Sequence, residues 1–294
     1  MIPGPVSVKP ILDAPARKRL FAGDLLVQRA VPTMSRLVAH LGHMATNAFH
    51  PQDPLRAHEH LDADAYLARL KDLRRGVRQD SGVAALFEKL LAGLGAEAAD
   101  TFSDRLNLRL VPPFASHQGR PADPLKPHRD TWGSGLLSQI NLWAPLGPLD
   151  AEATMVLYAD AWDHAVKNDS AGWDIAELRA QRAEGKTYPR LPIATTPDLG
   201  DARPILIEPG DILAFSGAHL HASHSARPNG PARLSFDFRV VMLSDHHAGR
   251  AAPDHDHAAP RQAPEWFKRP SDGLGLDAVT KDLAKTGSAL RASW

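Results

Sequence analysis

The chain has 294 residues, 43% of them hydrophobic, which is enough for one large domain or two small ones with a substantial core. Its 34 Lys and Arg residues equal its 34 Asp and Glu residues, so no overall field favours nucleic acid or an anionic membrane surface. The absence of cysteine excludes disulfides, thiolate metal sites and cysteine nucleophiles, which leaves histidine and carboxylate side chains as the candidate ligands for a transition metal.

The N-terminal segment lacks the apolar stretch of a signal peptide, and no apolar run approaches the ~18 residues that a membrane span needs. We therefore expect a soluble, cytoplasmic protein with no membrane span and no nucleic-acid partner. The sequence leaves the oligomeric state open, with a homodimer among the options.

The first hundred residues have the periodicity of amphipathic helices. Apolar positions recur at spacings of three and four in segments 25–45, 66–77 and 84–94. Pro32 is expected to start or kink the first helix, and Ser81 is expected to cap the N-terminus of the third. Residues 1–100 are thus predicted to be a helical buttress.

From residue 105 the apolar period changes to that of strands. Short segments that are rich in β-branched and aromatic residues, and separated by Pro and Gly, predict an antiparallel core over residues 105–243. These segments are 105–111, 139–143, 154–158, 205–208, 212–215 and 234–243. Segment 173–183 predicts a helix and 187–202 a loop, which together form an insertion over about 160–203.

The chain ends in an extension, residues 245–294, that begins with a segment rich in His, Ala, Pro and Asp. Residues 245–264 lack any periodicity, and this favours an exposed loop or linker. The segment contains His246, His247, His255 and His257. Flexible histidines of this kind bind adventitious metal, so the role of segment 246–257 stays open.

Two His-x-Asp sequences are candidate metal sites. The one at 60–62 begins a charged helical segment, where a carboxylate is expected to cap the helix. His128 and Asp130 instead lie between a loop rich in Pro and Gly and a predicted strand. In extended backbone, residues i and i+2 point to the same side, so both side chains could bind one ion. With a second imidazole they would form the facial set of two histidines and one carboxylate that non-haem Fe(II) oxygenases use.

Three histidines compete for the remaining ligand position: His219, His221 and His224. They follow the predicted strand 212–215. His219 and His221 share one strand face, whereas His224 lies on the other face if the strand continues. From the residues alone, all three would also fit a polar loop.

The order of five short motifs resembles the phytanoyl-CoA dioxygenase-like branch of the Fe(II)/2-oxoglutarate-dependent dioxygenases. The motifs are His-x-Asp-Thr-Trp from His128, Gln-x-Asn-x-Trp from Gln139, Gly-Asp-x-Leu-x-Phe from Gly210, Gly-Ala-x-Leu-His-Ala-Ser from Gly217 and Arg-x-Ser-x-Asp-Phe-Arg from Arg233. The resemblance covers about residues 105–243. In that family the distal ligand is a histidine followed by a small residue and then Ser or Thr, which here is His221. Its spacing to Arg233 differs from the family's by one residue, and this keeps His224 as an alternative.

The resemblance implies a mainly β fold with flanking helices, namely a double-stranded β-helix (a cupin-like jelly roll of two packed antiparallel sheets) in a single domain over 1–294. It implies Fe(II) held by His128, Asp130 and His221, with 2-oxoglutarate as co-substrate and O2 as oxidant. The implied activity is hydroxylation of an unactivated C–H bond of a small organic molecule, with release of succinate and CO2.

Further site residues follow from the same resemblance. The planar fork of Arg233 would bind the far carboxylate of 2-oxoglutarate. Other residues of the co-substrate site would be Ser223, Ser235, Gln139 and Asn141, and the candidates on the substrate side are Thr131, Trp132 and Trp162. From its place on the predicted strand, Arg239 is expected to form an ion pair, with Asp237 or a residue of an inserted loop as the candidate partner.

Asp130 also bears on the type of reaction. The halogenases related to this family have Ala or Gly at this position, so the carboxylate favours hydroxylation, or desaturation or ring closure, over halogenation. A metal-binding cupin without turnover, such as a ligand sensor, is the alternative from another functional class. Arg233 argues against a sensor, because a sensor needs no residue to bind 2-oxoglutarate.

Overall fold

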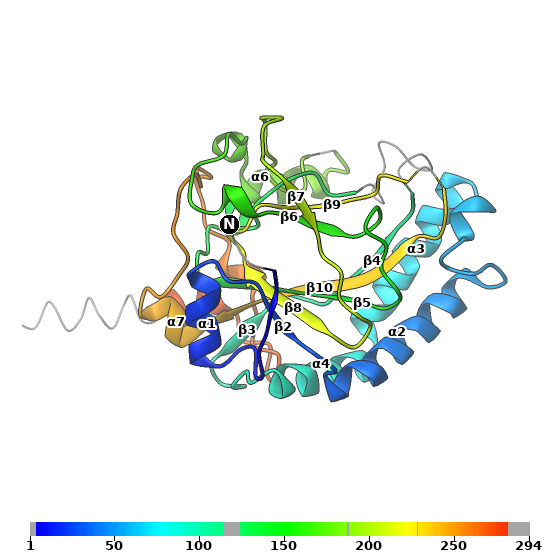
Figure 1. Ribbon diagram of the computed structural model, residues 1–294, viewed down its shortest axis with the longest axis horizontal. Helices are drawn as coiled ribbons and strands as arrows, with labels where there is room; N and C mark the ends of the chain where they lie inside the picture. Colours follow the sequence, from blue (N-terminus) through cyan, green and yellow to red (C-terminus); the bar gives the residue numbers. More distant parts are fainter. Residues whose placement is uncertain (1–3, 114–123, 187, 228, 282–294) are drawn as a thin grey trace, which may run out of the picture.

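Two β-sheets form the centre of the structure, and helices cover the outer face of the larger sheet (Figure 1). The computed structural model describes residues 4–113, 124–186, 188–227 and 229–281. In these ranges the larger sheet has seven strands in the order β1-β2-β8-β5-β10-β3, and β4 pairs with β10 beside β3. The smaller sheet has the order β7-β6-β9. The pairs are antiparallel except for β1–β2.

The strands of the larger sheet are β1 (Val6–Ser7), β2 (Leu26–Gln28), β3 (Thr101–Ser103), β4 (Asn107–Val111), β5 (Gln139–Pro145), β8 (Ile212–Ser216) and β10 (Arg233–Met242). Those of the smaller sheet are β6 (Met155–Tyr158), β7 (Ala202–Pro204) and β9 (His221–Ser223). The described strands form two separate sheets and do not join into a closed barrel.

Helices α2 (Pro32–Phe49), α3 (Ala63–Gln79) and α4 (Ser81–Gly93) lie along the outer face of the larger sheet (Figure 1). Other helices are α1 (Ala14–Phe21), α5 (Thr131–Ser134), α6 (Ile175–Ala183) and α7 (Leu243–His247), and residues 276–281 are also helical. The 3-10 turns are η1 (Ala57–Glu59), η3 (Ala159–Ala161), η4 (Ser170–Gly172) and η5 (Pro264–Trp266). Within the described ranges, no helix is both long enough and apolar enough to cross a membrane.

Strand β10 separates the core from the space between the sheets, because successive side chains point to opposite faces. Its even-numbered residues pack in the core against α2, α3 and α4, namely Leu234, Phe236, Phe238 and Val240. Its odd-numbered polar residues face the smaller sheet, namely Arg233, Ser235, Asp237 and Arg239. One strand therefore contributes both to the hydrophobic core and to the cavity between the sheets.

A second apolar cluster holds the two sheets together. Val27, Trp143, Leu213 and Phe215 of the larger sheet pack with Met155 and Leu157 of the smaller one. Ile205 and Ile207 belong to the same cluster but lie outside the strands, so the strand predicted over 205–208 is wrong. The pairing with β6 falls three residues earlier, on β7. The apolar character of 205–208 reflects packing between sheets, not strand pairing.

The predicted N-terminal helices are confirmed, with two corrections. The first helix begins at Pro32, and residues that precede it form strand β2, because the fixed φ of proline suits the first turn of a helix. The N-cap of α4 is Asp80, not Ser81: its carboxylate accepts from the amide of Val83 at 2.8 Å. The predicted helix in the insertion is also present, as α6.

The prediction of an exposed loop or linker over 245–264 is confirmed in part: residues 248–263 form neither helix nor strand, and more than half of 245–264 are exposed, but the segment is not a free linker. Residues 243–247 form helix α7, and the chain beyond it is bound to the body of the protein by backbone and side-chain hydrogen bonds. The sequence did not predict this attachment, because it depends on polar contacts with distant segments that leave no periodic pattern in the sequence.

Candidate metal centre

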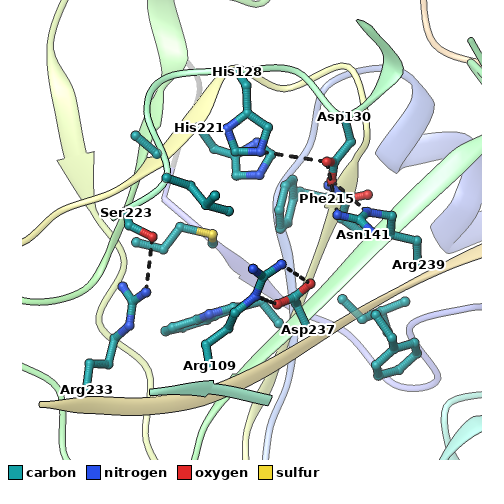
Figure 2. Close-up of a pocket in the computed structure, with 16 residues that line it drawn as sticks. Arg109, His128, Asp130, Asn141, Phe215, His221, Ser223, Arg233, Asp237 and Arg239 are labelled. Carbon is teal, nitrogen blue, oxygen red and sulfur yellow. Dashed lines mark hydrogen bonds and ion pairs between the residues drawn. The ribbon is translucent and has the colours of Figure 1, made fainter. Parts of the chain in front are cut away.

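The structure brings His128, Asp130 and His221 together at one side of a cavity between the sheets (Figure 2). One candidate ligand atom from each lies within 4.8 Å of the others. The two imidazole centroids are 4.2 Å apart, and Nε2 of His128 is 3.7 Å from Oδ1 of Asp130. The histidines are only 1% and 8% exposed. Within the described ranges, no other group of three such side chains converges in this way.

Backbone pairing sets the two histidines side by side. The amide of each donates to the carbonyl of the other at 3.0 Å, as an isolated antiparallel bridge. Asp130 does not lie in extended backbone, contrary to the sequence prediction: its φ of −64° and ψ of −29° are helical, and it begins α5. The chain turns after His128, and this turn brings the carboxylate to the imidazoles.

Each histidine presents an unprotonated nitrogen to the cluster. Nδ1 of His128 lies 2.7 Å from the carbonyl of Lys126, and Nδ1 of His221 lies 3.0 Å from that of His219. A carbonyl only accepts, so the proton is on Nδ1 and the lone pair is on Nε2. Burial lowers the pKa of His128 to about 3 and also lowers that of His221, so both rings are neutral near pH 7. Neutral imidazole with a fixed tautomer is the form that binds metal.

Asp130 is held as a carboxylate by donors on one side. Burial raises its pKa, but the charge of Arg239, the two imidazoles and the hydrogen bond from Arg239 together outweigh burial, and the pKa lies below its usual value. Oδ2 accepts from Nδ2 of Asn141 at 2.6 Å and from Nε of Arg239 at 3.0 Å. Among the described residues, Oδ1 accepts only from Nη2 of Arg239, at 3.2 Å, and it faces His128. Oδ1 therefore has a lone pair free for a single bond to a metal ion.

The ion pair predicted for Arg239 exists, but Asp237 is not its hydrogen-bonded partner. Its guanidinium donates to Asp130 and, through Nη1, to Asp104 at 2.6 Å. The backbone amide of Arg239 also donates to Asp104, at 2.7 Å. The two carboxylates hold the pKa of Arg239 well above its usual value despite burial, so its charge is permanent.

The other candidate histidines lie outside the cluster. His224 contributes no atom to it, and its amide donates to the carbonyl of Thr154 at 2.7 Å. His219 is buried with its ring stacked on Trp162, at 4.2 Å between centroids. The geometry therefore favours His221 over both neighbours as the third ligand.

Arg233 lines the same cavity on its other side (Figure 2). Its Nη2 donates to Oγ of Ser223 at 3.2 Å, while Nε and Nη1 are buried and have no partner within the described part of the chain. Burial lowers its pKa to about 10, which leaves it charged near pH 7. A buried cation with two unpaired nitrogens is suited to binding an anion. Ser235, on the same strand face, also has a buried Oγ without a partner.

The two predicted amides form a chain that ends on the metal site. Nε2 of Gln139 donates to Oδ1 of Asn141 at 2.8 Å, and Asn141 donates to Asp130. Asn141 lines the cavity, whereas Gln139 does not. The structure thus shows Asn141 orienting Asp130, and contact of either amide with a co-substrate stays a prediction.

The residues predicted on the substrate side are not brought to the cavity wall. Thr131 and Trp132 belong to α5 and are buried, and Nε1 of Trp132 donates to Asp256. Trp162 stacks on His219. None of the three lines the cavity between the sheets.

Sequence reasoning missed an ion pair in the cavity wall. Arg109 of β4 donates through Nε and Nη2 to Asp237 of β10, at 2.5 and 3.1 Å. The alternation along β4 was a usable signal, because Leu108 and Leu110 face the core and so Arg109 must face the other sheet. The remaining wall is apolar and includes Met155 and Phe215.

Removing the amide that orients Asp130 should weaken metal binding. For Asn141→Leu we expect roughly 10- to 100-fold lower affinity for Fe(II) or Co(II), because outer-shell partners of ligands contribute on this scale. Equilibrium metal titration measures the effect. Asn47→Leu is the control, since that amide lies on the exposed face of α2 and contacts His43. Equal affinities of the two variants would contradict the role of Asn141.

Metal affinity should change little between pH 7.5 and 5.5. Protons compete for Nε2 only as the pH approaches the pKa of the folded-state ring, which burial lowers to about 3 in His128. A site of exposed histidines, with an ordinary pKa near 6.5, would lose affinity below that pH. Co(II) titrations at the two pH values test this, and a tenfold or larger loss at pH 5.5 would contradict it.

No protein-family model and no curated protein matches this chain. Among solved structures, it is similar to EvdO2 from Micromonospora carbonacea var. aurantiaca complexed with 2-oxoglutarate, with 13% identity, a TM-score of 0.44, and coverage of 82% of this chain and 94% of that one. It is also similar to the epimerase SnoN in complex with Fe3+, alpha ketoglutarate and nogalamycin RO, with 16% identity, a TM-score of 0.38, and coverage of 78% of this chain and 85% of that one. For the non-haem monooxygenase ThoJ in its Ni complex the identity is 13%, the TM-score is 0.39, and the coverage is 77% of this chain and 76% of that one. These identities and TM-scores are too low to assign the chain to a family.

Proposed function

We propose that this protein is an Fe(II)- and 2-oxoglutarate-dependent oxygenase that hydroxylates a C–H bond of a small organic molecule. One observation carries the proposal. Two neutral imidazoles and a carboxylate converge in a buried cavity whose other side holds Arg233, a buried guanidinium with two unpaired nitrogens. A metal site and an anion site in one cavity suit a co-substrate that is a metal chelator at one end and a carboxylate at the other.

The fold that we propose is the double-stranded β-helix. Its support is the strand order, since β4-β10-β5-β8 of the larger sheet face β9-β6-β7 of the smaller sheet. The bridge between His128 and His221 adds a fourth short segment beside β9. Two four-membered antiparallel layers packed face to face are the arrangement of a jelly roll.

The donor set fits Fe(II). Nε2 of His128, Nε2 of His221 and Oδ1 of Asp130 would hold the ion and leave three of six positions open. When bound, Fe(II) would supply oxidation by O2 coupled to conversion of 2-oxoglutarate to succinate and CO2. Arg239 and Asn141 donate to Oδ2 of Asp130, so that the carboxylate would hold the ion through Oδ1 alone.

Arg233 would hold the far carboxylate of 2-oxoglutarate. Ser223 orients its guanidinium through one N–H of Nη2. The other N–H of Nη2, together with one of the two unpartnered nitrogens, Nε or Nη1, would then donate as a pair to the two carboxylate oxygens. A lysine would keep the charge but not this paired geometry. The apolar residues of the wall, Met155 and Phe215 among them, would exclude water from the reacting end.

Anaerobic titration of Fe(II) and 2-oxoglutarate into the metal-free protein tests the proposal. The weak visible charge-transfer band of the chelate should appear, and succinate should form when O2 is admitted. Iron binding without a band at any 2-oxoglutarate concentration would overturn the oxygenase and leave a metal-binding protein without this co-substrate. Product analysis then distinguishes hydroxylation from desaturation or ring closure.

A further inference from the structure

Arg129, the residue between two proposed metal ligands, is a buried cross-link between separate segments. Its side chain is 2% exposed. Nη1 donates to the carbonyl of Ala218 at 2.6 Å, three residues before His221. Nη2 donates to the carbonyls of Ala161 and His164, at 2.5 and 2.9 Å. Arg129 therefore ties the turn that carries His128 and Asp130 both to the segment that leads into His221 and to the insertion.

The charge of Arg129 is balanced by Asp256, a residue far away in the sequence. Oδ2 of Asp256 lies 3.1 Å from Nε of Arg129 and accepts from the amide of Val166 at 2.9 Å. Oδ1 accepts from Nε1 of Trp132 at 2.6 Å. The carboxylate is 7% exposed, and no other carboxylate of the described chain forms an ion pair with Arg129. Asp256 thus contacts both the ligand turn and the insertion.

Asp256 belongs to a segment that runs along α5, the short helix whose N-cap is Asp130. We call residues 249–263, which follow α7 and are orange in Figure 1, the C-terminal strap. The amide of Ala252 donates to the carbonyl of Leu137 at 3.1 Å, and that of Ala263 to Ser134 at 2.8 Å. Nε2 of Gln262 donates to the carbonyl of Gly135 at 3.1 Å. The strap is therefore held on both sides of Asp256.

We propose that Asp256 is a positioning residue for the metal centre and acts through Arg129. Loss of Asp256 leaves the buried guanidinium with only the more distant charge of Asp254, which is unfavourable, so we expect Arg129 to be displaced or water to enter beside it. Displacement moves, and water beside the side chain loosens, a residue that is covalently joined to His128 on one side and to Asp130 on the other. The strap thereby sets the geometry of ligands that it does not touch. This inference rests on the proposed metal site.

The test is Asp256→Asn, which keeps the size of the side chain and removes its charge. We expect roughly 10- to 100-fold weaker binding of Fe(II) and of Co(II), the range for groups that orient ligands. The visible absorption spectrum of bound Co(II) should also change, because it reports the geometry of the ligands and does not depend on turnover. All titrations are made at a temperature at which circular dichroism shows each variant folded.

Asp245→Asn is the matched control. Asp245 is also a buried carboxylate of the C-terminal region, 3% exposed, and pairs with Arg17 at 2.5 Å and Arg250 at 2.6 Å. It contacts neither ligand segment through these pairs. Its loss should lower the Tm, as that of Asp256 should, but should leave metal affinity and the Co(II) spectrum as in the wild type.

Wild-type metal affinity and an unchanged spectrum in Asp256→Asn would overturn the positioning role and leave Asp256 a stabilising residue like Asp245. If Asp256→Asn does not fold, Arg129→Lys replaces it: the charge stays, but the link between Ala218 and Ala161 is lost, and the same metal defect is expected. A wild-type protein that binds neither ion would overturn the proposed metal site itself, an outcome that is distinct from normal binding in the variant.

Discussion

Asp130→Ala is expected to abolish metal-dependent formation of succinate and to weaken Fe(II) binding by more than the roughly 100-fold that loss of an outer-shell partner can cost. The substitution removes one of three proposed ligands. It also leaves the donors of Asn141 and one side of Arg239 without their acceptor in a buried site. Equilibrium binding of Fe(II) and succinate release under excess Fe(II) measure the two effects.

The control is Asp237→Ala, which removes another carboxylate of the same cavity. Asp237 pairs with Arg109 and has no atom in the ligand cluster. Its loss should leave Fe(II) affinity within about tenfold of the wild type, since it is neither a ligand nor a hydrogen-bond partner of one. If both variants lost iron equally, general destabilisation of the cavity would explain the result better than ligation.

Arg233→Ala is expected to raise the KM for 2-oxoglutarate by roughly 30- to 3,000-fold. Truncation of one partner of a buried charge pair costs about 2–5 kcal/mol, and each 1.4 kcal/mol is a factor of ten. Fe(II) affinity in the absence of 2-oxoglutarate should not change, because Arg233 has no contact with the three ligands. Succinate formation as a function of 2-oxoglutarate concentration provides the measurement.

Two further variants sharpen this experiment. Arg233→Lys should give an intermediate KM, since the charge remains while the paired geometry is lost. Arg227→Ala, in the segment that precedes β10, removes an arginine paired with the exposed Asp150 and should leave KM unchanged. A KM that is unaffected in Arg233→Ala would remove the anion site from the proposal.

The parts of the site that sequence analysis predicted are those specified by short motifs. His128, Asp130, His221 and Arg233 occur at motif positions, and the structure places all four around one cavity. The strand alternation of β10 likewise follows from its period of two. These features could be predicted because each depends on residues that are close in the sequence.

The contacts that could not be predicted join distant segments. Arg109 and Asp237 are 128 residues apart, and Trp132 and Asp256 are 124 apart. No periodicity encodes such pairs, and the His-rich composition around Asp256 favoured a linker instead. The extended backbone predicted for Asp130 was wrong for a local reason. The chain turns there into α5, although the neighbouring strand pattern favours extended backbone.

Strands β1, β2, β3 and β7 were missed, and the bounds of β9 were not predicted, because each has only two or three residues. Such lengths show no alternation that can be distinguished from chance. Their pairing is decided by longer neighbours, as when β9 pairs with β6 and thereby places His221. The position of the strand that carries His221 is thus determined by tertiary contacts, which cannot be predicted from the sequence pattern.

The alternation along β10 limits how this protein can change during evolution. Stability comes from the face with Phe236 and Phe238, and the proposed chemistry from the face with Arg233 and Arg239. Inserting or deleting one residue would exchange the two faces and lose both at once. Heritable variation in specificity should therefore accumulate by substitution within β10, and by changes of length only in segments such as 160–203, which lie outside the larger sheet.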